Sequence, residues 1–144
     1  EAGFQVTVFE RQSTVGGVWY YREDEGPMYT SLVTNLPKEV MQYPDTPFPA
    51  DWPSYLHHSE ILQYLQSYAD IHRLWPLIRL NCSVDMVKRT GPPASPTWVV
   101  TSTRKGETAQ QTEEYDAVVV CNGHYDVPYA APLKGVEQFE GDVL

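Results

Sequence analysis

Gly3-Phe-Gln-Val-Thr-Val-Phe-Glu10 and Val15-Gly-Gly-Val-Trp19 are the two stretches that decide the fold of this chain. An apolar run that ends in an acid is typical of the second strand of a dinucleotide-binding βαβ unit, where the acid binds an adenosine ribose. The usual glycine fingerprint lies about twenty residues upstream of that acid, and no such residues precede Glu1. We therefore expect Glu10 to bind a ribose and the chain to be an internal piece of a larger enzyme. The alternative is a plain strand end with a solvated glutamate.

The glycine pair after this strand strengthens the expectation of a bound ligand. Gly16 and Gly17 allow the backbone to approach a ligand closely, and Trp19 offers a flat apolar surface beside them. Together with Glu10, these residues favour a cofactor site over a strand-end turn.

Composition sets the limits on what the chain can do. Its 144 residues, 42% of them apolar, suit one domain with a core. The net charge of −9 argues against binding to nucleic acid or to an anionic membrane surface. Cys82 and Cys121 lie in apolar, strand-like runs, so we expect buried reduced thiols. No apolar run approaches the roughly 20 residues of a membrane span.

Periodicity predicts an incomplete α/β sheet with an inserted antiparallel meander. Phe4–Phe9 reads as a strand, Arg11 to about Pro53 as a long irregular excursion, and Ser59 to about His72 as an amphipathic helix capped by Ser59. Ile78–Arg89 and Thr97–Thr103 predict a hairpin, and a turn at Lys105-Gly106 leads to a third strand near Thr112–Tyr115. Ala117–Cys121 reads as a strand buried on both faces of a parallel sheet.

Three further places in the sequence could carry chemistry. Asn35, in Thr34-Asn35-Leu36-Pro37, combines a donor and an acceptor on one amide, although a loop asparagine is usually a turn former. His57-His58-Ser59 invites a metal or general-base interpretation, but no second cluster at ligand spacing supports it and a helix start is favoured. Gly123 ends the Ala117–Cys121 run, where α/β sheets bind ligands, and we expect a cofactor contact there rather than an ordinary turn.

Taken together, these segments resemble the flavin-containing monooxygenases. The matching residues are Phe9-Glu10-Arg11, Val15-Gly-Gly-Val-Trp19, Tyr29-x-Ser31-Leu-x-Thr-Asn-Leu-Pro-Lys-Glu-Val-Met41, Tyr43-Pro-Asp-x-Pro-Phe-Pro49 and Tyr115-Asp-Ala-Val-Val-Val-Cys-Asn-Gly-His-Tyr125. Phe139-x-Gly141 begins the family's Phe-x-Gly-x-x-x-His motif, and the chain stops one residue before the histidine. The resemblance covers essentially the whole chain and is weak over Thr90–Gln111.

The resemblance implies two cofactors, FAD and NADPH, and a role for each matched residue. Glu10 would bind the FAD ribose, Val18 and Trp19 would line the FAD site after Gly16 and Gly17, and Val84 would contact the adenine through its backbone. Asn35 and Leu36 would lie by the isoalloxazine, with Thr34 and Asn35 also facing NADP. The two glycine fingerprints would lie outside the chain, so residues 1–144 are expected to be part of an FAD-binding domain and inactive alone.

The chemistry implied by the resemblance is oxygenation of a nucleophilic nitrogen or sulfur of a small molecule. NADPH reduces the flavin, and O2 then adds at its C4a carbon to give a hydroperoxide, which waits for an amine or sulfide. Asn35 could hydrogen-bond this group without supplying a proton, and no other nucleophile or base is needed. Location is left open between the cytoplasm and the endoplasmic reticulum, as are substrate, membrane attachment and oligomeric state.

Other readings stay open. A Baeyer–Villiger monooxygenase shares the two-dinucleotide design, and its longer identifying motif would fall beyond Leu144. A flavin-dependent disulfide reductase would need a redox cysteine pair close in sequence, which Cys82 and Cys121 are not. A truncated product that only binds a partner is the non-enzyme alternative.

Overall fold

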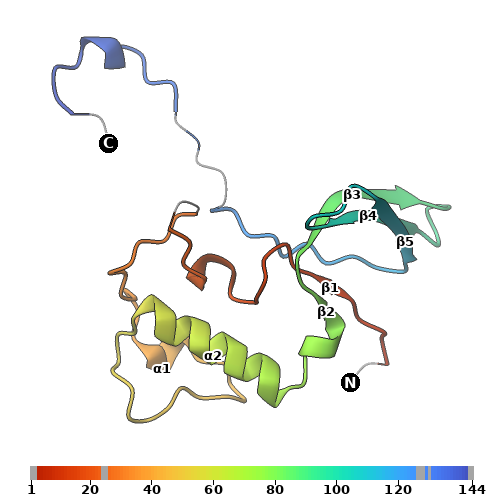
Figure 1. Cartoon of the computed structure of the whole chain (residues 1–144), viewed down its shortest axis with the longest axis horizontal. Helices are drawn as coiled ribbons and strands as arrows, with labels where there is room; N and C mark the ends of the chain where they lie inside the picture. Colours follow the sequence, from red (N-terminus) through yellow and green to blue (C-terminus); the bar gives the residue numbers. More distant parts are fainter. Residues whose placement is uncertain (1–2, 24–25, 126–128, 130, 143–144) are drawn as a thin grey trace.

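The computed structural model describes residues 3–23, 26–125, 129 and 131–142 of the chain. Its sheets are a parallel pair and a three-stranded antiparallel meander, with one long helix lying beside the irregular excursion (Figure 1). The strands are β1 (Val8–Phe9), β2 (Ile78–Arg79), β3 (Cys82–Thr90), β4 (Thr97–Arg104) and β5 (Gln110–Tyr115). The helices are α1 (Lys38–Met41) and α2 (His58–Ile71), with 3-10 turns η1 (Gly17–Trp19), η2 (Trp75–Leu77) and η3 (Val136–Gln138).

The parallel strands β1 and β2 come directly before the excursion and after α2 in the sequence, and they pair with each other. Val8 lies opposite Ile78 and Phe9 opposite Arg79, and parallel neighbours need a long crossover between them, which the excursion and α2 supply. The predicted strand Phe4–Phe9 is shorter than expected. Phe4 is 81% exposed, because among the described residues no second strand lies beside this end of the segment to pair with it.

The meander is confirmed, in the order β3-β4-β5 with antiparallel pairing throughout. The expected strand Ile78–Arg89 is in fact two strands. Asn81 separates them with a φ of 55°, a left-handed conformation that asparagine adopts more readily than most residues. The chain therefore turns at Asn81 from the parallel pair into the meander, and a bulge between Val84 and Met86 follows.

Helix α2 is confirmed, but its cap is not the expected one. His57, rather than Ser59, is the N-cap residue: its Nδ1 accepts from the Ser59 amide at 3.3 Å. The Glu60 carboxylate accepts from the His57 amide at 2.8 Å, which completes a capping box. His57 Nε2 lies 2.7 Å from the Thr30 carbonyl, to which Nε2–H donates. Both ring nitrogens therefore make structural hydrogen bonds. The favoured interpretation of the histidine pair as a helix start is confirmed.

The core lies between α2 and the excursion. Its buried members are Phe48, Leu56, Ile61 and Tyr64, with Trp19, Met41, Trp52 and Leu65 packed against them. The excursion has little regular structure of its own, so its backbone groups must find other partners.

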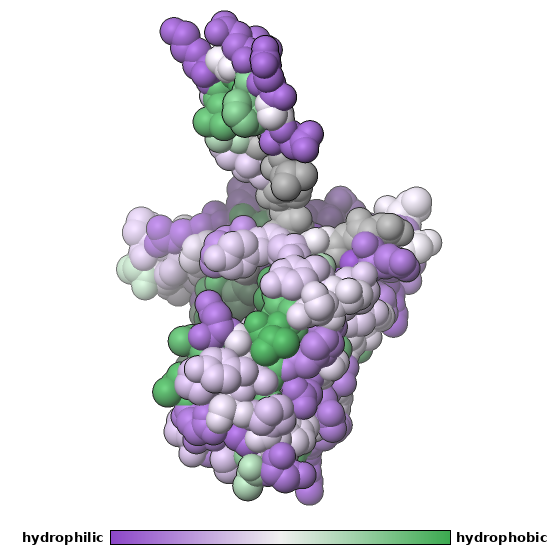
Figure 2. Space-filling model, turned by 90° about the vertical axis from the view of Figure 1, so that its left-hand side faces the viewer, coloured by the Kyte–Doolittle hydropathy of each residue, from purple (hydrophilic) through white to green (hydrophobic). Residues whose placement is uncertain are grey.

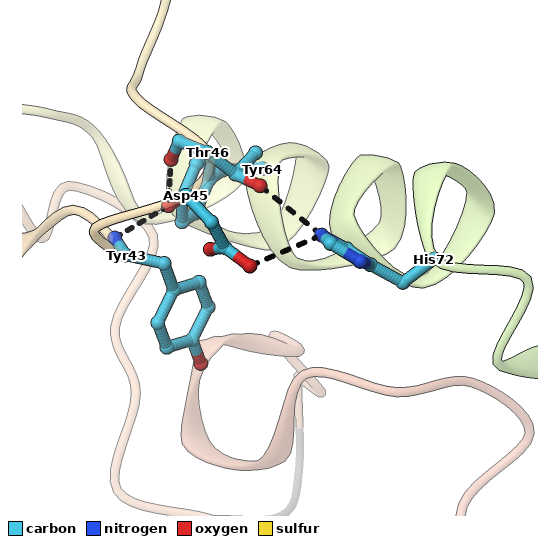
Figure 3. Close-up of polar contacts among 5 residues, drawn as sticks. All are labelled: Tyr43, Asp45, Thr46, Tyr64 and His72. Atoms are coloured by element: carbon cyan, nitrogen blue, oxygen red, sulfur yellow. Dashed lines mark hydrogen bonds and ion pairs between the residues drawn. The ribbon is translucent and has the colours of Figure 1, made fainter. Parts of the chain in front are cut away.

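A polar cluster fastens the excursion to α2 (Figure 3). The Tyr64 hydroxyl donates to the Thr46 carbonyl at 2.5 Å and accepts from the Tyr43 amide at 2.8 Å. His72 Nε2 lies 3.2 Å from the Thr46 hydroxyl and 3.7 Å from an Asp45 carboxylate oxygen. Burial is the main cause that raises the pKa of Tyr64, so the phenol remains protonated and keeps donating at neutral pH.

The expected strand Ala117–Cys121 does not form. Val119 and Val120 are 84% and 73% exposed, and no described strand pairs with this segment. A strand is defined by its neighbours, and an apolar run without a neighbouring strand has no ladder to join. The expected burial of Cys121 is wrong for the same reason, whereas Cys82 at the start of β3 is buried as expected, and both thiols are free.

The last described segment, with η3, extends away from the rest of the molecule (Figure 1). Among the described residues, no helix has the length and apolar character needed to cross a membrane.

Candidate cofactor-binding site

Asn35 and Leu36 form an exposed tip between two buried polar residues, Thr34 and Lys38. We call this pair the Asn35–Leu36 tip. On its first side, the Thr34 amide donates to the Leu56 carbonyl at 2.8 Å, and the Leu56 amide donates to the Thr34 hydroxyl at 2.9 Å. The same hydroxyl donates to the Leu36 carbonyl at 2.9 Å. Thr34 is 6% exposed, so its side chain anchors the loop, and its predicted contact with NADP stays a prediction.

Lys38 holds the other side of the tip. Its ammonium group donates to the carbonyls of Pro49, Ala50 and Trp52 at 2.7, 3.2 and 2.6 Å. Its backbone amide donates to the Ser54 carbonyl at 2.6 Å. Lys38 is only 7% exposed, which is rare for lysine unless the charge is well partnered.

The tip itself is free to meet a ligand. Asn35 is exposed, and Leu36 is 52% exposed, although leucine is normally a core residue. Figure 2 views the molecule from the side that carries α1 and the excursion, where apolar surface lies open among polar side chains. The loop thus presents one amide and one apolar side chain on a rigid base.

The glycine pair is built in two different ways. Gly16 has a φ of 134°, a conformation that residues with a side chain rarely adopt, and a Cβ there would lie 2.4 Å from Leu62 Cδ1 of α2, so the backbone conformation favours glycine and the helix packs close beside it. Gly17 has a φ of 53° and open space where a Cβ would stand. Val18 is exposed, while Trp19 is half-buried against the core. Gly16 therefore has a structural role. Gly17 and Val18 are the exposed residues of this turn, and a cofactor could reach them.

The first turns of α2 support both segments. Gly16 packs on Leu62, and the His58 amide, one turn earlier, donates to the Leu32 carbonyl at 3.1 Å just before the tip. The Tyr21 ring lies 5.8 Å from the His58 ring. The glycine turn and the tip loop are thus carried by one helix.

Glu10 lies where the two sheets meet. Its carboxylate accepts from the Gln12 amide at 2.7 Å through Oε1, its own amide donates to the Arg79 carbonyl, and its carbonyl accepts from the Cys82 amide. Among the described residues, Oε2 makes no hydrogen bond, and the predicted contact of Glu10 with a ribose hydroxyl stays a prediction. Val84 lies two residues after Cys82, in the first half of β3, and is 40% exposed.

A cavity of about 1220 Å³ opens beside this junction. None of the predicted site residues lines it, but neighbours of three of them do: Gln12 after Glu10, Ser83 and Asp85 around Val84, and His124 after Gly123. The segments of Glu10, Val84 and Gly123 thus meet at one cavity, whereas the glycine turn and the loop of the Asn35–Leu36 tip contact α2.

Among the described residues, the cavity lining carries more basic than acidic side chains, in a chain that is acidic as a whole. The basic residues are Arg11, Arg22, Arg104 and Lys105, of which Arg11 and Arg22 already have partners, and the acids are Asp85 and Glu107. Tyr125 and Tyr129 add aromatic surface. Cationic and aromatic groups around a polar cavity suit a phosphorylated ligand with a planar ring, so the residues present fit the nucleotide part of FAD.

Sequence reasoning missed Lys38 and the basic lining. The sequence around Lys38 does not indicate that this lysine is buried. The three carbonyls that bind its ammonium group come from residues 49–52, which are distant in sequence. Among the residues that the structure describes, no group of three His, Cys, Asp or Glu could hold a metal.

Known proteins with similar sequences are monooxygenases. The family described as "Flavin-binding monooxygenase-like" matches residues 1–144. Flavin-containing monooxygenase FMO GS-OX-like 4 of Arabidopsis thaliana is 37% identical over 96% of this chain and 36% of its own length. Dimethylaniline monooxygenase [N-oxide-forming] 2 of Pan troglodytes is 34% identical over 98% of this chain and 27% of its own length. The chain therefore spans about a third or less of these relatives.

The solved structures agree on the fold. S-allyl-L-cysteine S-oxygenase from Allium sativum superposes with a TM-score of 0.80 at 32% identity, over 94% of this chain and 34% of that one. OTEMO in complex with FAD and NADP superposes with a TM-score of 0.68 at 20% identity, over 98% and 25%, and shares the fold. The α/β fold of the two-dinucleotide flavoproteins, with its inserted meander, is thus confirmed, and so is the expectation of FAD and NADPH as cofactors of this class. The chain belongs to the flavin-binding monooxygenase-like family.

Proposed function

We propose that the protein containing this chain is an FAD- and NADPH-dependent monooxygenase that transfers one oxygen atom from O2 to a nucleophilic nitrogen or sulfur of a small molecule. Residues 1–144 contribute part of its FAD-binding domain. The names of the relatives support this substrate class, since one forms N-oxides and one oxygenates the sulfur of S-allyl-L-cysteine.

The observation that carries the proposal is the exposed Asn35 on a rigid, buried base. FAD supplies the oxygen-activating chemistry when it is bound. The chain has to supply position, a donor, and shielding from water. Asn35 offers an amide N–H that cannot release a proton at neutral pH, and Leu36 beside it offers apolar surface. Thr34 and Lys38 fix both by hydrogen bonds of 2.6–3.2 Å.

Near the tip, the exposed Glu39 carboxylate accepts from the Ser54 hydroxyl at 3.0 Å, and the two histidines are engaged or buried. Both nitrogens of His57 are engaged, Nε2 with the Thr30 carbonyl and Nδ1 with Ser59. His58 is buried. A reaction in which the cofactor activates the oxygen and the substrate is the nucleophile needs no acid–base group from the protein, so oxygenation is compatible with these surroundings.

A Baeyer–Villiger monooxygenase is the second candidate. Cyclohexanone monooxygenase with bound ε-caprolactone superposes with a TM-score of 0.70 at 20% identity, a likeness of fold alone. A non-catalytic binding module is the third. The cavity and the tip are compatible with all three candidate functions. Flavin binding, NADPH consumption and the substrate that is oxygenated therefore have to distinguish them.

The test uses the purified full-length protein. An absorbance spectrum first shows whether flavin is bound. NADPH consumption and oxygenated product are then measured with N,N-dimethylaniline, a thioether and a cyclic ketone. We expect flavin absorbance and product from the amine or the thioether. Product from the ketone alone would favour the Baeyer–Villiger reading, and a colourless protein that does not consume NADPH would favour the binding module.

A further inference from the structure

Lys38 is a buried cation that the proposed chemistry does not use. All three donors of its ammonium group are accounted for by the carbonyls of Pro49, Ala50 and Trp52. An ammonium has three N–H donors and no acceptor, so the group is saturated. The neighbouring carboxylate of Glu39 accepts from the Ser54 hydroxyl at 3.0 Å instead. The charge of Lys38 therefore meets the negative ends of peptide dipoles.

These contacts make Lys38 the centre of the turn at residues 49–52. Within the turn, one backbone hydrogen bond, from the Trp52 amide to the Pro49 carbonyl at 3.2 Å, closes the loop. Three carbonyl oxygens that converge on one point repel each other unless a cation lies between them. Removing the ammonium would take a donor from all three carbonyls in a part-buried site and leave the Pro49 carbonyl with the Trp52 amide, and the loss of such bonds is costly.

The turn is coupled to the Asn35–Leu36 tip through the backbone. Lys38 follows the tip directly after Pro37, whose ring fixes φ, and its amide bonds the Ser54 carbonyl. On the other side, Thr34 bonds Leu56 in both directions. The tip is therefore clamped at both ends to one segment, residues 49–56, in which Lys38 supplies a buried charged link and Glu39, through the Ser54 hydroxyl, an exposed one.

We propose that Lys38 is a positioning residue: its ammonium group, held by three carbonyls, sets where Asn35 stands relative to the reacting cofactor. This inference rests on the proposed function, because it takes Asn35 to act at the flavin. Lys38 does not touch the cofactor or the substrate. Its effect should appear in the yield of oxygenated product, since displacing a catalytic group by about 1 Å costs up to about 100-fold.

The first experiment compares full-length wild type, Lys38→Met and the control Lys88→Met, which removes an exposed lysine on β3. Product formed, hydrogen peroxide released and NADPH consumed are measured for each. We expect Lys38→Met to lower the product-to-NADPH ratio at least about threefold, a modest part of the positional range, with peroxide rising to match. Lys88→Met should behave as wild type.

This ratio separates positioning from a merely structural role. A variant with less folded protein or less FAD loses product and NADPH consumption together, and the ratio stays constant. An unchanged ratio in Lys38→Met, with wild type active, would overturn the proposal while leaving the proposed function intact.

The second experiment needs no activity. Amide hydrogen exchange is followed on FAD-free full-length wild type and Lys38→Met at the amides of Thr34, Lys38, Trp52 and Leu56. We expect Lys38→Met to speed exchange at all four by about tenfold or more, equal to about 1.4 kcal/mol of opening free energy, with β4 unchanged. Should the variant fail to fold, wild type alone decides: the four amides should exchange as one unit, and independent, faster exchange at Thr34 and Lys38 would refute the clamp. This arm holds even if wild type proves inactive, so a failed function and a failed inference are told apart.

Discussion

Asn35 is the residue on which the proposed chemistry depends most directly. Its amide stands exposed at the tip, and Asn35→Asp keeps the size but replaces the donor with a carboxylate. A negative charge about 4 Å from an electron-rich cofactor costs about 4 kcal/mol at an effective dielectric of 20. We expect NADPH still to be consumed, product to fall and hydrogen peroxide to rise.

The control for this change is Gln138→Glu, which makes the same amide-to-acid exchange at an exposed position of η3. Product, peroxide and NADPH are measured for both variants of the full-length protein. If Asn35→Asp and Gln138→Glu gave the same product-to-NADPH ratio as wild type, Asn35 would be a turn residue and nothing more.

Glu10 gives the second prediction at this scale. Because its Oε1 accepts from the Gln12 amide, Glu10→Ala removes a structural bond together with the proposed ribose contact. Glu10→Gln keeps a carbonyl oxygen for Gln12 and loses the charge. We expect Glu10→Ala to weaken FAD binding by about 1–3 kcal/mol, or roughly 5- to 150-fold in Kd, and Glu10→Gln to weaken it less. Flavin fluorescence titration of the full-length apoprotein measures both, and an unaltered FAD affinity in Glu10→Ala would remove Glu10 from the site.

The sequence could indicate the tip but not its base. The run from Thr34 to Lys38 predicts a loop with a functional asparagine, since proline and asparagine have strong local preferences. It does not predict that Thr34 and Lys38 turn inward while Asn35 and Leu36 turn outward. That division depends on acceptors in residues 49–56, which are distant in sequence, and no local pattern records them.

The meander is held to the parallel pair by a latch that includes Arg79, Glu113, Phe9 and Tyr115. The Arg79 guanidinium donates two hydrogen bonds to the Glu113 carboxylate and stands 5.3 Å from the centre of the Phe9 ring. The Phe9 and Tyr115 rings meet edge to face at 6.1 Å. The latch crosses from β1 and β2 to β5, so it fixes how the meander lies over the junction at Glu10.

This latch predicts a pH dependence. The hydrogen bond from Arg79 lowers the pKa of Glu113 below its ordinary value of 4.5. A carboxyl whose pKa is lower in the folded state adds stability above its unfolded pKa, and this is lost as pH falls through the folded pKa. The side chains are 42% and 35% exposed, so after discounting for solvent screening the pair contributes at most about 1 kcal/mol.

The measurement compares wild type with Glu113→Gln by thermal unfolding at neutral pH and below about pH 4. We expect wild type to be slightly more stable at neutral pH and the two proteins to converge in acid. High salt should shrink the difference at neutral pH, because the pair is partly exposed. A difference that persists unchanged in acid would show that the pairing does not depend on the Glu113 charge.

At the scale of elements, the sequence predicts best what depends on local pattern. The 3.6-residue period placed α2 within about one residue of its observed bounds, and turn chemistry placed the meander. The cap was misplaced because a histidine side chain took the accepting role that serine usually has. The prediction of a strand at Ala117–Cys121 is wrong for another reason. A buried parallel strand forms only between neighbouring strands, and an apolar run does not by itself indicate whether such neighbours are present.

Apart from the segment with η3, the described molecule has two parts that meet at Asn81. One part contains the core, the glycine turn and the tip on α2, and the other is the meander (Figure 1). The basic cavity lies beside the turn between them, with Arg11 and Gln12 on one side and Thr103, Arg104 and Lys105 on the other. The predicted residues thus fall into two groups, one beside the cavity and one on the loops that contact α2, and their joint use by one dinucleotide stays a prediction.

The exposed apolar segments carry the last prediction. Phe4, Val119 and Val120 are each more than 70% exposed, and an open run of this kind is a template for pairing with another chain. We therefore expect residues 1–144, expressed alone, to hold no FAD stably and to self-associate. Light scattering gives the mass and absorbance gives the flavin content.

The cause can be isolated with Val119→Ser/Val120→Ser. If this run drives self-association, the double change should make the isolated chain more monomeric. If the run instead is covered in the full-length protein, as a buried strand would be, the same change should lower the melting temperature there, because each buried valine contributes about 1.5 kcal/mol or more. We therefore expect the double change to improve the behaviour of the isolated chain, by reducing its self-association, and to lower the melting temperature of the full-length protein. A yellow, monomeric 144-residue chain, or a double change that is neutral in both contexts, would show that the run is a surface segment with no partner.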